Sequence, residues 1–561
     1  MESPDQLKPI DISKHSKLVA DWDSLQRIFI RPEDEDCKAT LLKYMEQILF
    51  GLHEFLNSHV GVTEEISLLN LTETYKETLI SSEPEKKLAD VISDIISSIA
   101  PRAVNVASPY FVGHMTAAIP FFMVHLKAIV AALNQNVIKL ETSKVLSVLE
   151  KQVLAKIHRL IFDLDESFYQ KHVQSTDTSL GSFTTGGTTA NLTALWVARN
   201  HFFSPCDGFE GIETEGMAGA LNHHGFDKAI YLVSKRCHFS LKKAGGILGV
   251  GNKHVIPVDV NAEYRMDVSK LSKMIKSFSK SAGTSGRKGK TAIMAVVGVA
   301  GATETGIVDP LYEIADVCRE HSIHFHVDAA WGGPVLLSEA YAGKLAGIER
   351  ADSVTIDGHK QFFMPMTCGM VFFRDPKIMD RIAYYSNYVN RQGSVDLGIK
   401  TLEGSREANS LILDSALKIM GTKGYALMID HGIETTRAFA DEIKKRQMFE
   451  LVTEPELNIL TYRLVPPHIG KLREKAYDRK EIERLDGLLD DINIMVQRKQ
   501  REAGRSFVSR TRVNCAPCRE NDHEVVVLRA VIMNPMTTIR VLSEVLDEQE
   551  KIYKSISHEE A

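Results

Sequence analysis

The sequence predicts an α/β fold with a mostly parallel central sheet. Short apolar runs of strand length alternate with helical or loop segments through the middle of the chain, which is the pattern of β-α-β units. At 561 residues the chain is also too long for one compact core, so we expect two or three domains. The predicted strands are Ala229–Val233, His254–Val258, Thr291–Val299, Ser322–Val327 and Ser353–Ile356, with Cys368–Phe373 expected to pair back onto them.

Composition and charge exclude several classes of function. The chain is 44% hydrophobic and 25% charged, and its formal net charge of −6 is small for its length. It therefore offers no general attraction for nucleic acid or anionic membranes. No apolar run approaches the roughly 20 residues of a membrane span, and we expect no secretory signal. Seven thinly spread cysteines predict reduced thiols in a cytoplasmic protein.

The first segment, residues 1–105, is predicted to be helical. Apolar residues recur at helical spacing in Ala39–Leu56 and Lys87–Ile99, and Pro101 fits the end of the second stretch. No pattern typical of catalysis occurs here, so we expect this segment to have an accessory role or to contact another subunit.

Residues 106–385 are predicted to form the large domain that carries the sheet. A long helical pattern runs from about Pro120 to Ile161, and Gly181–Asn191 then places a glycine pair and hydroxyl residues before the helical Leu192–His201. Such a helix start can cradle a phosphate, because its first N–H groups are unpaired and its dipole favours an anion. An ordinary helix cap explains the same residues equally well.

Residues 386–561 are predicted to form a smaller α+β domain. Ser405–Ile419 has a helical pattern, Val525–Met533 reads as a strand, and Thr538–Tyr553 is the expected closing helix. Two stretches of the large domain, Pro205–Phe226 and Ser277–Lys290, are rich in turn residues and are expected to be surface insertions.

Two residues at the ends of predicted strands suit one demanding cofactor. Asp328 ends the run Ile323–Val327, at the edge where open α/β sheets place ligands, and Lys360 follows Ser353–Ile356. Pyridoxal phosphate (PLP) needs such a pair, an amine for a Schiff base and a carboxylate against its pyridine nitrogen. An aspartate that caps a turn and a surface lysine in an aromatic loop are the alternatives.

The remaining candidates are weaker when taken alone. His238, after the first predicted strand, can stack on a cofactor ring, although a lone histidine is more often a packed or surface residue. Cys515 and Cys518 form a single CxxC without a second ligand pair. His324 and His326 face the same side of a strand, but no third ligand accompanies them, so we expect no metal site.

Taken together and in chain order, these motifs carry a resemblance. The sequence is similar to the group II PLP-dependent amino-acid decarboxylases over roughly residues 105–540, and most of all to a bacterial branch of aspartate 1-decarboxylases. The resemblance implies the PLP-dependent transferase fold of the aspartate-aminotransferase type (type I) and a homodimer. It rests on Thr-Gly-Gly-Thr-Thr-Ala-Asn (185–191), His238, Ala-Gly-Ala-Thr (300–303), His-Val-Asp-Ala-Ala-Trp-Gly-Gly (326–333) and Asp-Gly-His-Lys (357–360).

The resemblance also implies a role for each matching residue. Lys360 would bond to the cofactor, and Asp328 would keep its pyridine nitrogen protonated. His359 would assist the phosphate or proton transfers, or simply pack beside the lysine. The remaining implied contacts are His238 and Ala330 on the ring faces, Thr303 near the ring, and Gly187 and Thr188 on the phosphate.

Substrate-binding residues are implied in the same way. Arg529 occupies the place of a carboxylate-binding arginine in the glutamate branch, and Asn134 aligns with a substrate-pocket asparagine. His114 stands where glutamate decarboxylases carry a glutamine, which implies a differently shaped pocket. In the tyrosine-rich catalytic loop, the position of the family's proton-donating tyrosine holds Arg391, so Tyr388 is the substitute candidate.

The implied activity is α-decarboxylation of an acidic amino acid, first of all L-aspartate to β-alanine. Glutamate decarboxylation to 4-aminobutyrate is a close alternative, because one methylene changes binding by only about 1–3 kcal/mol. Cysteine sulfinate or aromatic amino acids as substrates, another PLP lyase or aldehyde-forming oxidase, and a non-catalytic scaffold of the same fold are further alternatives.

Overall fold

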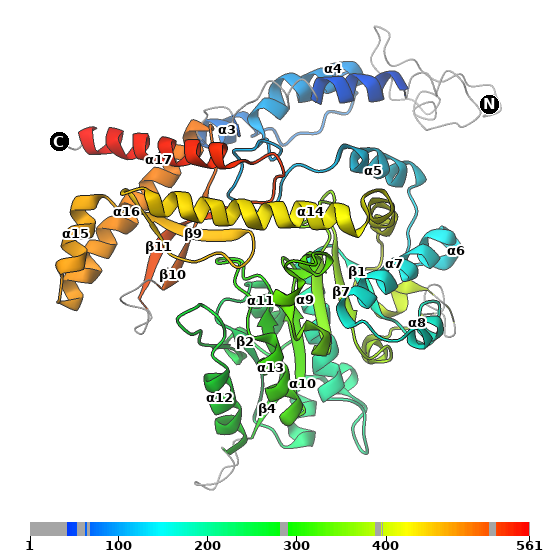
Figure 1. The fold of residues 1–561 in the computed structure, drawn as a ribbon. Coiled ribbons are helices and arrows are strands. Elements are labelled where there is room, and N and C mark those ends of the chain that lie inside the picture. The colour runs from blue at the N-terminus through cyan, green and yellow to red at the C-terminus, as the bar shows by residue number, and fades with distance from the viewer. Residues whose placement is uncertain are drawn as a thin grey trace, which may run out of the picture. The chain divides into compact units, whose positions relative to one another are not determined.

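The computed structural model describes residues 42–52, 62–63, 68–280, 290–386, 394, 396–514 and 523–559 (Figure 1). The chain divides into two compact units. The larger unit comprises Gly113–Asn493 and Ser509–Ile539, and the smaller comprises Met1–Val112, Ile494–Val508 and Arg540–Ala561. The division into segments 1–105, 106–385 and 386–561 stays a prediction. Among the described helices, none has the length and apolar character needed to cross a bilayer.

A seven-stranded sheet forms the centre of the larger unit. All its strands run parallel except β7, which pairs antiparallel with both β1 and β6. The α/β prediction is therefore confirmed, as is the expectation that Cys368–Phe373 pairs back. Across the sheet the order is β1 (Gly181–Thr184), β7 (Gly369–Phe373), β6 (Ser353–Asp357), β5 (His324–Asp328), β4 (Thr291–Val299), β2 (Lys228–Ser234) and β3 (Val255–Val258).

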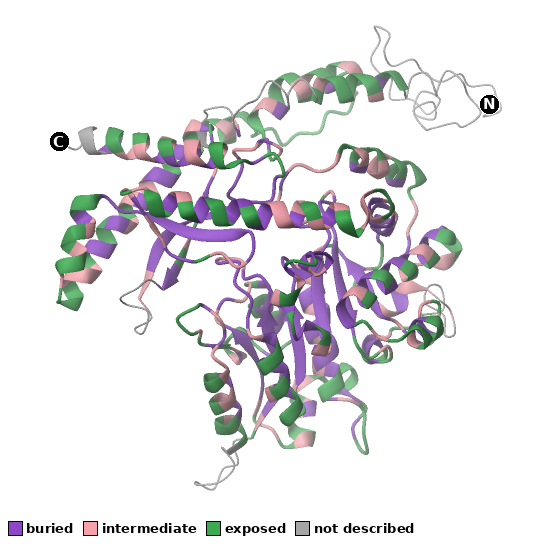
Figure 2. Cartoon of the chain, in the orientation of Figure 1, coloured by how far each residue is buried: buried purple, intermediate pink, exposed green. Residues whose placement is uncertain are grey.

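Helices cover both faces of this sheet. Successive strand residues point to opposite faces, so Ile230 and Leu232 of β2 pack in one core cluster while Tyr231 and Val233 pack in another. The strands are consequently buried along nearly their whole length, as Figure 2 shows. The first cluster contains α7 (Val145–Phe162), α12 (Val268–Lys280) and α13 (Leu311–Glu320), and the second contains α9 (Gly187–Phe202), α10 (Ile212–His224) and α11 (Ser240–Ile247).

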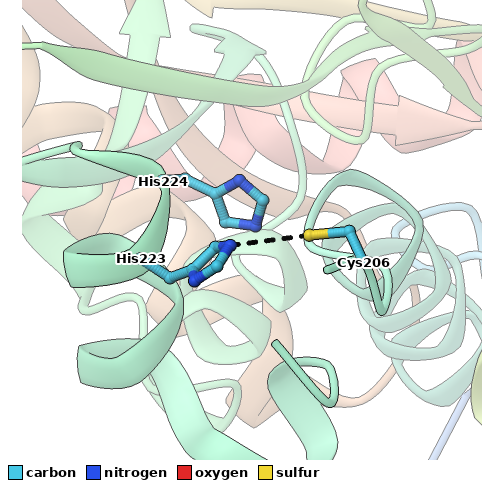
Figure 3. A group of neighbouring side chains, drawn as sticks. All are labelled: Cys206, His223 and His224. Atoms are coloured by element: carbon cyan, nitrogen blue, oxygen red, sulfur yellow. Dashed lines mark hydrogen bonds between the residues drawn. The ribbon is translucent and has the colours of Figure 1, made fainter. Parts of the chain in front are cut away.

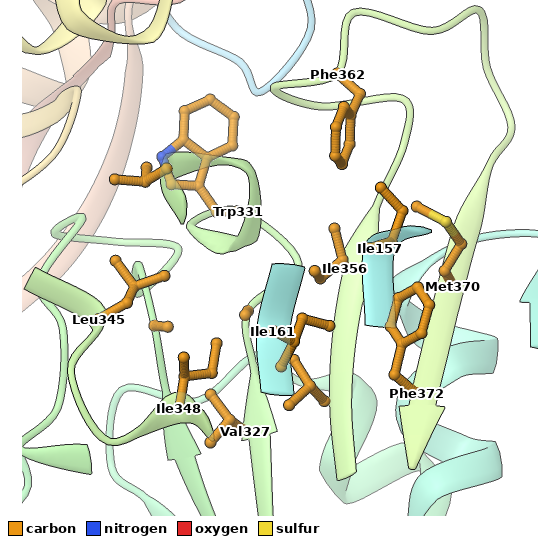
Figure 4. Close-up of a cluster of buried hydrophobic side chains, with 14 of the residues drawn as sticks. Ile157, Ile161, Val327, Trp331, Leu345, Ile348, Ile356, Phe362, Met370 and Phe372 are labelled. Atoms are coloured by element: carbon orange, nitrogen blue, oxygen red, sulfur yellow. The ribbon is translucent and has the colours of Figure 1, made fainter. Parts of the chain in front are cut away.

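Part of the first cluster is drawn in Figure 4. There Ile157 and Ile161 of α7 lie against Ile356 of β6 and Met370 and Phe372 of β7. This packing holds the strand before the predicted lysine loop and the strand after it against one helix. Burying an aliphatic or aromatic side chain of this size stabilises a fold by about 1.5–3 kcal/mol, so the loop begins and ends on firmly held strands.

The carboxyl ends of β1, β5 and β6 meet at one edge of the sheet. β7 starts at that edge, where Gly369 pairs with Thr184 on one side and with Asp357 on the other. A Cβ on Gly369 would lie 2.5 Å from the backbone carbonyl carbon of Gly186, so only glycine fits there. The close approach brings the end of β1 and the end of β6 to the same place, which is where chemistry was predicted.

Two predicted helices differ from those observed. The pattern from Pro120 to Ile161 is three helices, because Asn134 and Lys144 adopt positive φ angles of 44° and 41° that end one helix before the next begins. The helix predicted at Ser405–Ile419 begins later and continues far beyond it. The observed helices are α5 (Phe121–Leu133), α6 (Leu140–Ser143) and α7 in the first case, and α14 (Asn409–Lys445), with non-helical angles at Gly421, in the second.

One predicted insertion contains more order than expected. Within Pro205–Phe226 lies the helix α10, and most of Ser277–Lys290 falls outside the described residues. The remaining short elements of the larger unit are α8 (Glu166–His172) and the helical turns η4 (Asn252–His254), η5 (Gly333–Leu337), η6 (Ala342–Leu345), η7 (Ile348–Arg350), η8 (Ile378–Ile382) and η9 (Leu397–Lys400).

A second, antiparallel sheet follows in the C-terminal part of the chain. Its strand order is β10 (Ser509–Asn514), β11 (Glu524–Val531), β9 (Ile459–Leu464) and β8 (Phe449–Leu451), so the predicted strand at Val525–Met533 is confirmed. Arg463 of β9 is fully buried and forms ion pairs with Asp486 and Asp490 at 2.8 and 2.5 Å. The helices here are α15 (Pro467–Lys475) and α16 (Arg479–Ala503).

The smaller unit is mainly helical in its described part. The closing helix predicted at Thr538–Tyr553 is observed as α17, Ile539–Glu559, and the stretch predicted at Lys87–Ile99 is α4 (Leu88–Asp94) continued by η2 (Ile95–Ile99). The other elements are α3 (Leu68–Thr74) and η3 (Ala100–Arg102).

Candidate active site

A glycine-opened helix start forms one end of the candidate site. β1 ends at Thr184, and α9 begins two residues after Thr185 with Gly187 in its first turn. A Cβ on Gly187 would lie 2.8 Å from Asp357 Oδ2 and 3.3 Å from Ala330 Cβ, so the glycine lets the helix start approach the end of β6. The unpaired N–H groups of this first turn, together with the helix dipole, suit a phosphate group.

Asp328 ends β5 and is held by a chain of polar side chains. Asn191 Nδ2 donates a hydrogen bond to Asp328 Oδ2 at 2.8 Å, and Asn191 Oδ1 lies 3.1 Å from His326 Nε2. Because a carboxylate and an amide oxygen can only accept, Asn191 presents its amide nitrogen to Asp328 and His326 Nε2 carries a proton. Ser353 then donates to His326 Nδ1 at 2.9 Å.

Burial keeps the middle of this chain uncharged. It lowers the pKa of His326 to about 4, so the ring is neutral near pH 7. Asp328 is itself buried, and its Oδ1 accepts the backbone N–H of Ala330 at 3.2 Å. The carboxylate is thus fixed in orientation at the carboxyl edge of the sheet, as an acceptor for a protonated ring nitrogen needs to be.

Lys360 lies in the loop between β6 and β7. Its Nζ is 2.9 Å from Oδ2 of Asp357, the last residue of β6. The neighbouring His359 is fixed by donation from its Nδ1 to the Cys368 carbonyl oxygen at 2.6 Å, which directs Nε2 toward Asp357 at 3.8 Å. Asp357 is 2% exposed, and its Oδ1 has no hydrogen-bond partner among the described residues.

One cavity of about 300 Å³ joins these groups. That volume lies at the lower end of the range of small-molecule sites, about 300–1,000 Å³. All eight residues predicted to contact the cofactor line it, namely Gly187, Thr188, His238, Thr303, Asp328, Ala330, His359 and Lys360. A buried carboxylate, a lysine amine and an open helix start in one cavity fit PLP, which carries a ring nitrogen, an aldehyde and a phosphate.

His238 forms part of the cavity wall. Its Nδ1 accepts the backbone N–H of Ser240 at 3.3 Å, and burial lowers its pKa, so a neutral flat ring is presented. The face of the cofactor that His238 or Ala330 covers stays a prediction.

Two of the predicted substrate residues, Arg529 and His114, do not line the cavity, but His114 interacts electrostatically with Lys360 and His359. Arg529 of β11 is buried, and its Nη1 donates to the carbonyl oxygen of Gly113 at 3.3 Å and to Ser509 Oγ at 3.2 Å. Desolvation lowers the pKa of Arg529 to about 10. The pKa of His114 is lowered by desolvation and then by electrostatic interaction with Arg529, Lys360 and His359.

Asn134 and Tyr388 are not brought to this cavity by the described structure. Asn134 ends α5 in a left-handed conformation and is exposed, and it is not among the lining residues. Tyr388 and Arg391 lie outside the described residues, as do Cys515 and Cys518. Their roles stay predictions.

Sequence reasoning assigned no role to Asp357 or Asn191. A signal existed for Asn191, because it lies four residues after Gly187 and a helix brings such positions onto one face. His326 belongs to the cofactor motif, and because it lies two residues before Asp328 on β5, the two side chains face the same side of the sheet. Asp357 gave no signal beyond being an acidic residue beside the lysine.

Fold and site together define a PLP-dependent enzyme with an α/β fold. Comparison with known proteins narrows the class, since residues 72–465 match the family model described as the pyridoxal-dependent decarboxylase conserved domain. The chain belongs to this family and is a PLP-dependent amino-acid decarboxylase. The predicted fold class, cofactor and enzyme class are confirmed.

Individual relatives agree with this assignment. Aspartate 1-decarboxylase of Aliivibrio fischeri is 42% identical over 546 residues, covering 97% of each chain. The human acidic amino acid decarboxylase GADL1 is 29% identical and covers 84% of each chain. Among solved structures, that of mouse CSAD has a TM-score of 0.74 at 24% identity, covering 91% of this chain and 99% of its own. Oryza sativa TDC with PLP and tryptamine has a TM-score of 0.76 at 17% identity, covering 94% and 100%.

Proposed function

We propose that this decarboxylase removes the α-carboxyl group of L-aspartate, giving β-alanine and CO₂. The proposal is supported by the 42% identity with an aspartate 1-decarboxylase over nearly the whole chain. It is also supported by the unpaired Nε and Nη2 atoms of Arg529, which are the observation that carries it.

The guanidinium of Arg529 is hydrogen-bonded at one corner and unpaired along one edge among the described residues. Nη1 is occupied by Gly113 and Ser509, whereas Nε and Nη2 are buried and have no hydrogen-bond partner among the described residues. A buried donor without a partner costs about 1–3 kcal/mol, more for a charged group, so this edge favours a ligand that accepts twice. A carboxylate does so in the bidentate geometry that arginine prefers.

Two other ionisable side chains, Glu304 and His114, interact electrostatically with Arg529. Glu304 is half-buried, and desolvation raises the pKa of its carboxyl above the ordinary value. The pKa of His114 is lowered, so its ring is neutral near pH 7. Arg529 is then the cation available to pair with a substrate carboxylate.

For the reaction, Lys360 and Asp328 would hold the cofactor at its aldehyde and its ring nitrogen, with Gly187 and Thr188 on the phosphate. When bound, PLP supplies the ring that accepts the electron pair left behind as CO₂ departs. Asp328, fixed by Asn191, stabilises positive charge at the ring nitrogen. Thr303, His238 and Ala330, which line the cavity, would limit the position of the ring and so orient the substrate that reacts on it.

After CO₂ leaves, a proton must return to the substrate carbon. We propose Tyr388 as its donor, on the position of the tyrosine-rich loop in the sequence. Asn134 is proposed to contact the substrate and His359 to assist proton transfer. Asp357 would hold the amine of Lys360 at the cavity through their 2.9 Å ion pair.

A homodimer is proposed as well, with residues 1–105 as contacts to the partner. In the larger unit, α5 exposes large apolar side chains, of which Phe121 is 78% exposed. Such a surface is typical of association sites. Its other exposed large apolar residues are Val124, Ile129 and Leu133. Light scattering of wild-type protein and of the Phe121→Ser/Leu133→Ser variant tests this, and a monomeric wild type would contradict it.

A substrate panel tests the proposed function. The purified enzyme, loaded with PLP, is incubated with aspartate, glutamate, cysteine sulfinate and tyrosine, and each amine product is quantified. We expect kcat/KM to be highest for aspartate, and a preference for any other substrate would contradict the proposal. Lys360→Ala serves as the inactive control, and it should also lose the visible absorbance of the covalently bound cofactor.

A further inference from the structure

Three side chains that commonly ligate metals meet on the larger unit, outside the candidate active site (Figure 3). They are Cys206, just after α9, and His223 and His224, in the last turn of α10. One ligand atom from each lies within 4.8 Å of the other two. None of the three lines the cofactor cavity.

The spacing of these atoms is close to that of a tetrahedral zinc site. Bonds of about 2.3 Å to sulfur and 2.0–2.1 Å to nitrogen, at the tetrahedral angle, put the two ligand atoms about 3.6 Å apart. Cys206 Sγ and His223 Nε2 are 3.6 Å apart. His224 can close the remaining gap by side-chain rotation, because the required movement is on the order of 1 Å.

The local fold holds the three ligands toward one point. Cys206 and Phe209 exchange backbone hydrogen bonds of 3.0 and 2.9 Å, which closes the turn that presents the thiol. The ring of Phe209 stacks on His223 with centroids 5.1 Å apart and meets His224 edge-on at 5.2 Å. One turn therefore positions the sulfur and supports both imidazoles.

A second observation points to a ligand at this place. His224 Nε2 is buried and has no hydrogen-bond partner among the described residues. Figure 3 shows a ring nitrogen of His224 directed toward His223 and Cys206 rather than away from them. An unpaired buried nitrogen is costly by about 1–3 kcal/mol, and coordination of a cation would remove that cost.

We propose that Cys206, His223 and His224 bind one divalent cation of the zinc type, with water completing a tetrahedral site. A thiolate with two imidazoles favours Zn²⁺, Co²⁺ and similar cations over Mg²⁺ and Ca²⁺, which prefer oxygen ligands. Because the cysteine follows α9 and the histidines end α10, the bound cation would tie the two ends together. This site is independent of the decarboxylation proposed above.

Cobalt(II) is the probe, added to full-length PLP-loaded enzyme after removal of metal by chelation. Tetrahedral Co²⁺ is read from its ligand-field bands at the red end of the spectrum, away from the cofactor's absorbance. All proteins carry Cys515→Ser and Cys518→Ser, so the separate CxxC cannot supply the signal. We expect one tetrahedral Co²⁺ per chain, displaced by Zn²⁺, and a thermal midpoint that rises with added Zn²⁺.

Single substitutions locate the site. Cys206→Ser and His223→Gln should each weaken Co²⁺ binding at least tenfold and abolish the Zn²⁺-dependent rise in thermal midpoint. His468→Gln, an exposed histidine on α15, is the matched control and should change neither readout. Retained cofactor absorbance verifies that each variant is folded. The absence of tetrahedral bands in the parent protein, or bands unchanged in Cys206→Ser, would overturn the proposal.

Discussion

Asn191 Nδ2 lies 2.8 Å from Asp328 Oδ2, although 137 positions separate the two residues. The same amide holds its oxygen against His326, and it stands one helical turn after Gly187. A single side chain therefore joins the helix start that suits a phosphate to the carboxylate that suits a ring nitrogen. The two ends of the proposed PLP site are positioned together rather than separately.

Replacing Asn191 by alanine should weaken cofactor binding. The change removes a hydrogen bond to a charged group, worth about 1.5–3 kcal/mol, so we expect roughly ten- to a hundredfold weaker affinity for PLP. Equilibrium dialysis with spectroscopic detection measures it. Asn200→Ala, a buried asparagine of the same helix bonded to Glu213 and the Arg381 carbonyl, controls for loss of a buried amide. Equal affinities in the two variants would contradict the role given to Asn191.

Gly187→Ala should disrupt the helix start. The new methyl group would lie 2.8 Å from Asp357 Oδ2, which cannot move without giving up its ion pair with Lys360. We expect at least a tenfold loss of PLP affinity with the fold retained by circular dichroism. Gly343→Ala places its methyl in open space and should leave both unchanged. An unaltered affinity in Gly187→Ala would show that the helix start does not contact the cofactor.

Arg529→Lys tests whether the unpaired Nε and Nη2 atoms of Arg529 bind the substrate carboxylate. Lysine keeps the charge but not the planar fork, so bidentate binding is lost while electrostatic attraction remains. We expect kcat/KM for aspartate to fall roughly ten- to a hundredfold, because hydrogen bonds to charged groups contribute about 1.5–3 kcal/mol. Arg512→Lys, on the exposed side of the adjacent strand β10, is the control. If both variants react alike, Arg529 does not bind the substrate.

Stability should fall as the pH is lowered from about 6.5 to 4. Burial lowers the pKa of His158 in α7 to about 4, where it bonds Tyr169 Oη and the Phe373 carbonyl oxygen. The unfolded chain binds a proton at this histidine below its ordinary pKa of about 6.5, whereas the folded chain does not. The contribution of neutral, buried His158 to the free energy of unfolding is thus complete above pH 6.5. It declines by about 3 kcal/mol as the pH falls to 4.

Urea unfolding at several pH values measures this decline. His158→Gln removes the titrating group while keeping an N–H for the Phe373 carbonyl, so its stability should be lower at pH 7 but flatter with pH. His326, whose pKa is also lowered to about 4, still contributes in the variant. A pH dependence identical to that of the wild type would exclude His158 as a source.

The positions of Asp328 and Lys360 could be predicted because both follow apolar runs of strand length. In a mostly parallel sheet such runs end at one edge, whatever the helices between them do. The end of α5 could not be predicted, because Asn134 adopts a left-handed conformation and the apolar pattern continues past it. Similarly, the end of α6 at Lys144 could not be predicted, because Lys144 has a positive φ angle although lysine is not a typical turn residue.

Side-chain networks were harder to predict from the sequence than the positions of strand ends. The bond between Asn191 and Asp328 depends on how α9 packs over β5, which periodicity does not specify. The meeting of Cys206 with His223 depends on the turn closed by Phe209 and on the packing of its ring. Contacts of this kind arise from tertiary packing between residues that carry no shared motif.

The place of β7 between β1 and β6 has a consequence for synthesis of the chain. β1 is translated long before Gly369–Phe373, and until β7 inserts, the end of β1 has no strand to join it to β6. A nascent chain that has emerged from the ribosome only as far as Lys360 already contains every residue proposed to hold PLP. These residues are not yet arranged as in the complete sheet. Cofactor capture is therefore expected to follow the emergence of β7 from the ribosome, because this long-range pairing completes the sheet.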